Sequence, residues 1–141
     1  MILIVDDDIA VRTSLSLLLK NTGNEIVSTD SPVQAFEVVK TQKPALVVLD
    51  LNFSIDTSGE EGMSLLKKIR TVDAGVPIIL ITGWASIELA VEGMKLGAND
   101  FINKPWSNDY MLQTVETLLQ LNGKPTVSQS RKSLTKKYNF S

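Results

Sequence analysis

The stretch that most constrains the fold is Leu46-Val47-Val48-Leu49-Asp50, in which four apolar residues end on a carboxylate. A short apolar run with β-branched residues is typical of a strand buried on both faces, as in the middle of a parallel sheet. In an open α/β sheet the ligand site lies just beyond the carboxyl ends of the strands. Asp50 would lie there. It could also simply begin a turn, so the other strand ends decide between these two interpretations.

The rest of the chain alternates strands with helices. Four further strands are expected, at Ile2–Val5, Glu25–Thr29, Ile78–Ile81 and Phe101–Ile102. Each strand is followed by apolar residues at helical spacing, which predicts a helix after every strand. The residues expected to face the core, helix by helix in chain order, are Val11, Leu15, Leu18 and Leu19; Ala35, Phe36 and Val39; Met63, Leu66 and Ile69; Ile87, Ala90, Val91 and Met94; and Met111, Val115, Leu118 and Leu119. Five such β-α units predict an α/β fold with a doubly wound, five-stranded parallel sheet in the flavodoxin-like order 2-1-3-4-5.

Composition excludes several kinds of chemistry. The chain has no His and no Cys, which rules out a Ser-His-Asp triad, a phosphohistidine on this chain, disulfides and an ordinary zinc site. No apolar run approaches the roughly 20 residues that span a bilayer. The apolar start is interrupted at once by Asp6, Asp7 and Asp8, which is unlike a signal peptide. We therefore expect a cytoplasmic protein that does not contact a membrane.

Charge divides the chain into two parts. Residues 1–122 hold nine basic and sixteen acidic residues, a formal charge of −7, which disfavours binding to a phosphate backbone. Residues 123–141 hold five basic residues and no acid, contain Gly, Pro, Ser and Thr, and lack periodicity. We expect one domain over 1–122 and a linker over 123–141. Nucleic acid would be contacted only through a domain outside this chain.

Polar groups stand at the ends of four of the expected strands. Asp6 and Asp7 follow the first strand, Asp50 ends the third, Thr82 follows the fourth and Lys104 follows the fifth. Three carboxylates at one edge repel one another and favour a cation, and oxygen ligands select Mg²⁺ or Mn²⁺. A carboxylate can also accept a phosphoryl group. Lys104 and the Thr82 hydroxyl could then stabilise the phosphoryl oxygens.

These residues stand in four motifs, which are Ile4-Val5-Asp6-Asp7-Asp8, Leu49-Asp50-Leu51-Asn52, Ile81-Thr82-Gly83 and Lys104-Pro105. Over residues 2 to about 121 the chain resembles the receiver domain of bacterial two-component response regulators. The resemblance implies a phosphorelay switch that accepts a phosphoryl group from a sensor histidine kinase on Asp50 in a Mg-dependent reaction. Such a receiver catalyses its own phosphotransfer and slow autodephosphorylation, and it is not a turnover enzyme.

The resemblance also implies a role for each site residue. Asp7 and Asp50 would bind the metal directly, Asp6 would bind it through water, and the Asn52 backbone carbonyl would complete the shell. Lys104 would contact the phosphoryl group.

The resemblance also assigns residues to the switch and to its surroundings. Thr82 would contact the phosphoryl group and Phe101 would be the aromatic residue whose ring moves inward when Thr82 shifts. The Lys104-Pro105 bond would be cis. Next to Gly83, Trp84 would either shield the acyl phosphate from water or pack on the fourth helix.

One departure from the family pattern lies beside the site. The glycine that follows the phosphoacceptor in the family corresponds to Gly62, twelve residues after Asp50, so Phe53 to Gly59 is expected to carry about four extra residues.

Two other functions stay open at this point. An aspartyl-phosphate phosphatase needs a second carboxylate where Asn52 stands. A docking module that works without phosphate would not need the complete set of site groups.

The stretch from Leu89 to Trp106 resembles one subgroup most, the receivers of sigma-54-dependent, enhancer-binding (NtrC-type) transcription activators. In that subgroup a linker leads to an AAA+ ATPase domain that often opens with a Tyr-x-Phe segment, which Tyr138-Asn139-Phe140 would match. This chain has no GxxxxGK[ST] motif, so such an ATPase would lie outside it. Phosphorylation is expected to bias the surface of the fourth helix, fifth strand and fifth helix toward either a new partner or a homodimer.

Overall fold

The computed structural model describes residues 1–51, 60–83 and 87–122. Within these ranges strands and helices alternate along the chain. They are β1 (Ile2–Val5), α1 (Ile9–Leu19), the short 3-10 helix η1 (Lys20–Thr22), β2 (Ile26–Thr29), α2 (Pro32–Gln42), β3 (Leu46–Asp50), α3 (Glu60–Val72), β4 (Ile78–Thr82), α4 (Ile87–Lys95), β5 (Asp100–Asn103) and α5 (Asn108–Asn122).

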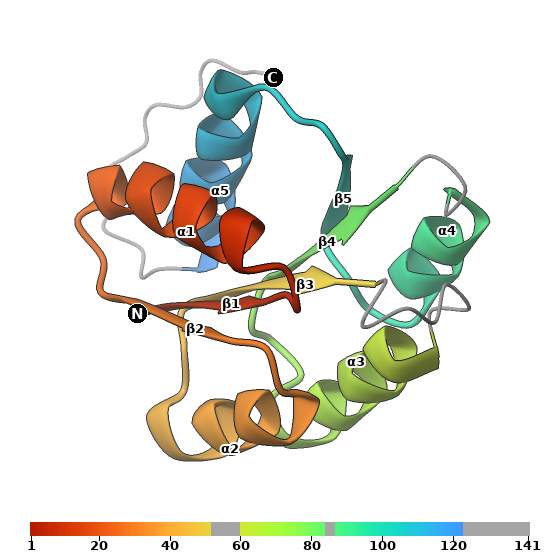
Figure 1. Ribbon diagram of the computed structural model, residues 1–141. Coiled ribbons are helices and arrows are strands. Elements are labelled where there is room, and N and C mark those ends of the chain that lie inside the picture. The colour runs from red at the N-terminus through yellow and green to blue at the C-terminus, as the bar shows by residue number, and fades with distance from the viewer. Residues whose placement is uncertain (52–59, 84–86, 123–141) are drawn as a thin grey trace.

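The strands form one parallel sheet in the order β2-β1-β3-β4-β5, as the sequence predicts. Helices α1 and α5 cover one face, and α2, α3 and α4 cover the other (Figure 1). Each face has its own apolar core. Residues of β3 alternate between them, with Val47 and Leu49 in one core and Leu46 and Val48 in the other. Every residue of β3 is buried, which confirms that this run is a central strand.

Local signals in the sequence set the starts of the first two helices. The Asp8 carboxylate accepts a hydrogen bond from the Ala10 amide and caps α1. Ser31 caps α2 by accepting from the Gln34 amide, with Pro32 in the first turn. Such caps satisfy amides that have no partner inside the helix and contribute about 1 kcal/mol each.

The predicted inner face of α4 is partly wrong. Ile87 and Val91 are 39% and 46% exposed, whereas Ala90 and Gly93 are buried. Leu89 and the predicted Met94 pack against the core beside Ala90 and Gly93, and the Leu80 side chain occupies the space that a Cβ atom on Gly93 would take. The close approach rotates α4 so that two of its β-branched residues face outward.

The C-terminal helix α5 runs to Asn122, and residues 123–141 lie outside the described ranges. The linker expected there therefore stays a prediction. Among the described residues no helix combines the length and the apolar character that crossing a bilayer requires.

Candidate functional site

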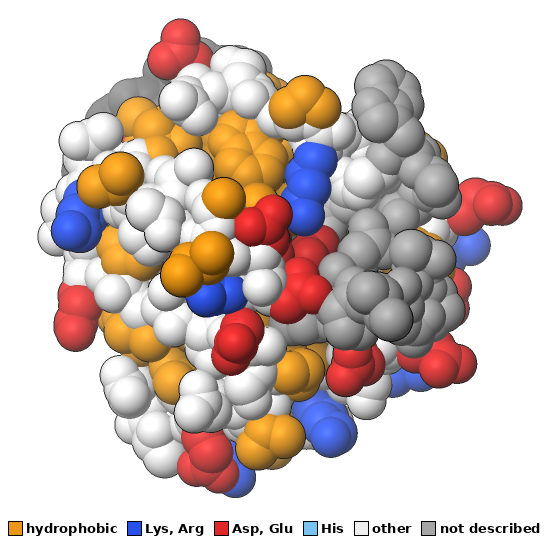
Figure 2. Space-filling view, in the orientation of Figure 1, with side chains coloured by type: hydrophobic (Ala, Val, Ile, Leu, Met, Phe, Trp, Pro, Cys, Tyr) orange, Lys and Arg blue, Asp and Glu red, His pale blue; other side chains and the backbone are white. Residues whose placement is uncertain are grey.

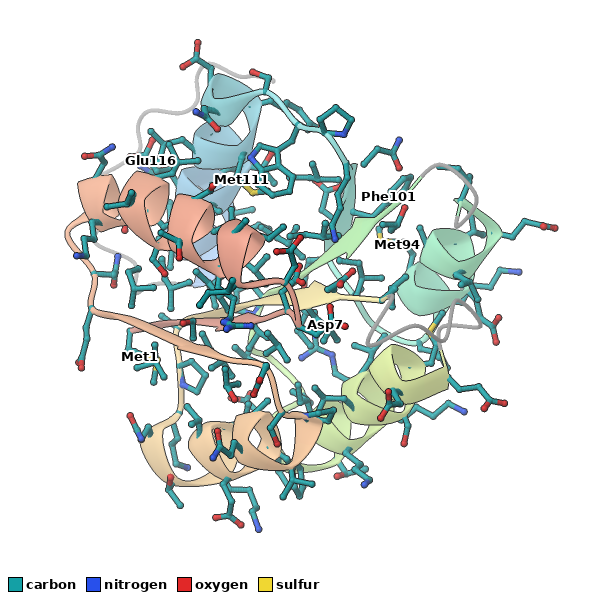
Figure 3. The ribbon with its side chains drawn as sticks, in the orientation of Figure 1. Met1, Asp7, Met94, Phe101, Met111 and Glu116 are labelled. Atoms are coloured by element: carbon teal, nitrogen blue, oxygen red, sulfur yellow. The ribbon has the colours of Figure 1, made fainter. Side chains whose placement is uncertain are left out.

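The pairing of the strands brings the predicted residues to one edge of the sheet, here called the carboxyl edge. Val5 pairs with Leu49, so the residues that follow them, Asp6 and Asp50, lie side by side. Asp50 in turn pairs with Ile81, which places Thr82 at the same level. In Figure 3 Asp7 lies where β1 leads into α1, at the same edge. The convergence expected from the sequence is thus present.

Three of the carboxylates form a tight cluster. One oxygen from each of Asp6, Asp7 and Asp50 lies within 4.8 Å of the others. Asp6 and Asp50 are almost fully buried, at 0% and 1% exposure, while Asp7 is exposed. Figure 2 shows acidic side chains gathered beside basic ones near the centre of the face in view. Like charges this close and this buried are unfavourable without a cation between them.

The cluster fits a hard divalent cation. All the side-chain donors are carboxylate oxygens, the ligands that Mg²⁺ and Mn²⁺ prefer. Asp6 Oδ2 is buried and accepts no hydrogen bond from the residues described here. A buried oxygen with this unused acceptor capacity is suited to a metal or to a water bound to one.

Lys104 supplies the positive charge of the site. Its Nζ atom lies 3.6 Å from Oδ2 of Asp6 and 3.6 Å from Oδ2 of Asp50. These distances are too long for direct hydrogen bonds but short enough for ion pairs. The Lys104 side chain is 30% exposed, so the ammonium can also reach a group that enters from solvent. The Lys104-Pro105 bond is cis, as predicted.

Burial raises the pKa of the Asp6 carboxyl above its ordinary value of 3.8, because the charged form loses solvation. The Asp8 amide, which donates to Asp6 Oδ1 at 2.9 Å, opposes the rise, and so does the charge of Lys104. The neighbouring charge of Asp7 adds to the rise. The site therefore holds one carboxylate that releases its proton reluctantly in the absence of a metal.

Thr82 is fully buried at the end of β4. Its Oγ1 lies 3.0 Å from the Gly83 carbonyl oxygen and 3.2 Å from Asn103 Oδ1, so the hydroxyl is hydrogen-bonded within the sheet edge. Phe101 pairs with Leu80 across β4 and β5 and is half-buried against the core under α2, α3 and α4. Its predicted movement stays a prediction.

Gly62 stands where α3 meets the end of β3. A Cβ atom on Gly62 would lie 2.9 Å from the Leu51 Cα, closer than real Cβ atoms approach other atoms, and 3.2 Å from the Asp50 carbonyl oxygen, which is a tight contact. The assignment of Gly62 as the family's glycine stays a prediction. Asn52, the loop from Phe53 to Gly59, and Trp84 lie outside the described residues, so the predictions for them remain predictions.

Two residues near the site were not found by sequence reasoning. Arg12, in α1, donates from Nη1 to the Asp6 carbonyl oxygen at 2.7 Å and so fixes the turn that carries the acidic residues. Asn103 contacts the Thr82 hydroxyl. The available signal for Asn103 was its position directly before Lys104, since parallel pairing places it opposite Thr82.

Comparison with known proteins agrees with this geometry. Residues 2–116 match the family model described as the response regulator receiver domain. The transcriptional regulatory protein ZraR of Escherichia coli is 36% identical over 118 residues, which cover 84% of this chain and 26% of ZraR. The C4-dicarboxylate transport transcriptional regulatory protein DctD of Pseudomonas aeruginosa is 34% identical over 120 residues, which cover 85% of this chain and 25% of DctD.

A solved structure extends the comparison to the fold. The crystal structure of the receiver domain of NtrX from Brucella abortus superposes with a TM-score of 0.78 at 30% identity, and the match covers 84% of this chain and 98% of that one. The chain thus spans about a quarter of ZraR and DctD but nearly all of a solved receiver. It belongs to the response regulator receiver domain family.

Proposed function

We propose that Asp50 is the phosphoacceptor of a two-component phosphorelay and receives its phosphoryl group from a sensor histidine kinase. The observation that carries the proposal is the position of the Asp50 carboxylate. It is buried at the carboxyl edge, paired with the Lys104 ammonium at 3.6 Å, and clustered with Asp6 and Asp7. Receiver-domain membership supplies the reaction class.

In the proposed transfer an Asp50 carboxylate oxygen attacks phosphorus, a P–O bond forms, and the bond between phosphorus and the histidine nitrogen of the kinase breaks. Such a transfer depends on positioning and charge neutralisation more than on covalent chemistry by the protein. Phosphorylation converts the Asp50 carboxylate into an acyl phosphate, so the negative charge then lies on the phosphoryl oxygens. Lys104, which pairs with Asp50 beforehand, is then available to the phosphoryl oxygens, and the Thr82 hydroxyl can donate to another of them.

Asp6, Asp7 and Asp50, with the Asn52 backbone carbonyl, are the groups that would hold Mg²⁺ or Mn²⁺. When bound there, the metal neutralises charge on the phosphoryl oxygens. The protein's own part is to fix the ligands. Arg12 anchors the Asp6 carbonyl, and the Asp8 amide orients the Asp6 carboxylate.

We further propose that the domain acts as a switch with slow loss of the phosphoryl group, and not as a turnover phosphatase. The chain has no His to act as a general base at neutral pH. The position two residues after Asp50, where aspartyl-phosphate phosphatases carry a second carboxylate, holds Asn52. Both features favour a long-lived acyl phosphate over repeated hydrolysis.

The output surface is proposed to be the one formed by α4, β5 and α5. Phosphorylation would draw Thr82 toward the phosphate and allow Phe101 to repack, which changes this surface. Ile87 and Val91 on α4 and Tyr110 on α5 are exposed, at 39%, 46% and 51%. Apolar groups exposed on neighbouring elements support a contact with a second copy of the chain or with another partner.

For the whole protein we propose an NtrC-type transcription activator. Residues 123–141 would be the linker to an AAA+ region and a DNA-binding region that are not in this chain. ZraR and DctD support this, since both are named transcriptional regulatory proteins and the matched part is about a quarter of each.

The test is phosphorylation of the purified chain by acetyl phosphate with Mg²⁺, followed by intact-mass spectrometry. The wild type should gain one phosphoryl group and Asp50→Asn should gain none. Asp30→Asn is the matched control, because Asp30 is an exposed aspartate that follows β2 at the same edge and is not one of the three clustered carboxylates. Equal labelling of Asp50→Asn and wild type would refute the assignment, and repeated turnover of a small phosphoester would favour the phosphatase instead.

A further inference from the structure

We infer that Asn103 is a positioning residue that holds the Thr82 hydroxyl in a resting orientation and competes with the phosphoryl group for it. The inference rests on the proposed function of Asp50 and Thr82. It adds a residue outside the acidic cluster that sets how readily the switch responds.

The contact follows directly from the strand register. Thr82 and Asn103 are partners in the β4–β5 pairing, and the Lys104 amide donates to the Thr82 carbonyl oxygen at 2.8 Å. The two side chains therefore lie next to each other at the carboxyl edge, with Thr82 Oγ1 3.2 Å from Asn103 Oδ1. Because Thr82 is fully buried, its hydroxyl has little access to water and depends on protein partners.

The Asn103 contact competes with the phosphoryl group for the Thr82 hydroxyl proton. A hydroxyl has a single proton to donate. In this structure that proton is within reach of the Gly83 carbonyl oxygen and of Asn103 Oδ1. To donate to a phosphoryl oxygen on Asp50, the hydroxyl must give up both. With the amide turned over, Asn103 Nδ2 would donate to Thr82 Oγ1, and this bond would also have to break when Thr82 moves.

The position of Asn103 couples two parts of the site. It directly precedes Lys104, whose ammonium lies 3.6 Å from Asp50 Oδ2. The strand end that carries the phosphate-binding cation therefore also carries the group that retains the hydroxyl. Loss of the Asn103 contact would remove one of the two groups that retain the Thr82 hydroxyl, leaving the Gly83 carbonyl, without removing any group that touches the phosphoryl oxygens.

The effect should have the size of one neutral hydrogen bond. Removing such a bond from the resting state alone shifts the balance toward the phosphate-bound orientation by about 2- to 10-fold. Asn103→Ala should therefore bind a phosphoryl analogue more tightly than the wild type by about that factor. A substitution that only damaged the strand end would weaken binding, so the direction of the change is diagnostic.

The experiment is titration of the full chain with beryllofluoride at saturating Mg²⁺, followed by two-dimensional amide NMR. The matched control is Asn24→Ala. Asn24 Nδ2 donates to Thr22 Oγ1 at 3.1 Å, so this variant loses a side-chain bond between Asn and Thr away from the carboxyl edge. Its beryllofluoride affinity should equal that of the wild type. Asn103→Val, a residue suited to a strand, replaces Asn103→Ala if the alanine variant does not fold.

The decisive comparison uses the Thr82→Val background, which lacks the hydroxyl but keeps its shape. If Asn103 acts through the hydroxyl, Asn103→Ala changes nothing in that background. The inference is overturned if Asn103→Ala leaves the affinity unchanged or lowers it, or if it has the same effect with and without the Thr82 hydroxyl. A wild type that binds no beryllofluoride with Mg²⁺ would instead overturn the proposed function and this inference with it.

Discussion

Lys104 Nζ lies 3.6 Å from Asp50 Oδ2, and it lies at the same distance from Asp6 Oδ2. Two buried carboxylates therefore share one ammonium, and the exposed Asp7 adds a third negative charge beside them. Without a metal the site carries excess negative charge in a poorly solvated place. The charges that suit the site to a cation therefore lower the stability of the metal-free protein.

Asp50→Asn should stabilise the metal-free protein. The substitution keeps the shape of the side chain and removes one of two buried like charges, so the free energy of unfolding should rise by about 1 kcal/mol. Urea unfolding in EDTA measures the change. Asp30→Asn, at an exposed residue, should stay within about 0.5 kcal/mol of the wild type. A less stable Asp50→Asn protein would mean that the contacts of the carboxylate outweigh the repulsion.

The raised pKa of Asp6 predicts a pH dependence of stability. Burial makes the folded chain hold the Asp6 proton at a pH where the unfolded chain has released it. From the unfolded value of 3.8 up to the raised folded pKa, the contribution of Asp6 to stability therefore falls as pH rises. Asp6→Asn removes the group while keeping an acceptor for the Asp8 amide.

The measurement is urea unfolding of wild type and Asp6→Asn in EDTA at a series of pH values from about 3.8 upward. The stability of the variant relative to the wild type should increase with pH through that window and then level off. A difference that does not change with pH would show that Asp6 titrates alike in the folded and unfolded chains.

Magnesium should raise the free energy of unfolding by binding between the clustered carboxylates. A ligand that binds only the folded state stabilises it by RT ln(1 + [L]/Kd), or roughly 1.4 kcal/mol at about ten times Kd. Thermal unfolding with added MgCl₂ should show this increase, and EDTA should remove it. The Asp7→Asn variant should lose most of the stabilisation by Mg²⁺. Because Asp7 is exposed, the stability of this variant without metal should stay close to that of the wild type. An equal response in NaCl of matched ionic strength would indicate screening instead of a bound ion.

The sequence was sufficient for the sheet and for the acidic cluster. Parallel strands deliver their last residues to one edge, so the apolar runs that end on Asp50 and before Asp6 already place these carboxylates together. The face of α4 could not be found in this way. Apolar periodicity assigned Ile87 and Val91 to the core, but Gly93 lets the helix approach Leu80 and turns them outward.

Two hydrogen bonds near the site could not be predicted from the sequence either. The bond from Arg12 to the Asp6 carbonyl depends on the rotation of α1 about its axis, which an apolar stripe defines only coarsely. The contact of Asn103 with Thr82 depends on the register of β5 against β4, and a slip by one residue would point the Asn103 side chain to the other face. Such partners become visible only when the pairing is known.

Gly62→Ala should destabilise the domain and displace Asp50. The new Cβ would lie 2.9 Å from the Leu51 Cα and 3.1 Å from its carbonyl oxygen, and backbone atoms cannot swing aside as a side-chain end can. Alanine favours a helix over glycine by about 1 kcal/mol, which offsets part of the cost. We expect a net loss of about 1–2 kcal/mol in the free energy of unfolding.

Because Leu51 directly follows Asp50, the same displacement should slow phosphorylation of Gly62→Ala by acetyl phosphate. Gly75→Ala is the matched control, since no heavy atom beyond its two chain neighbours lies within 4 Å of its Cβ position and its φ is not positive. That variant should keep or slightly gain stability and should be phosphorylated at the wild-type rate. If both variants unfold at the wild-type urea concentration, α3 can move away from Leu51 freely, and the close approach at Gly62 does not position the phosphoacceptor.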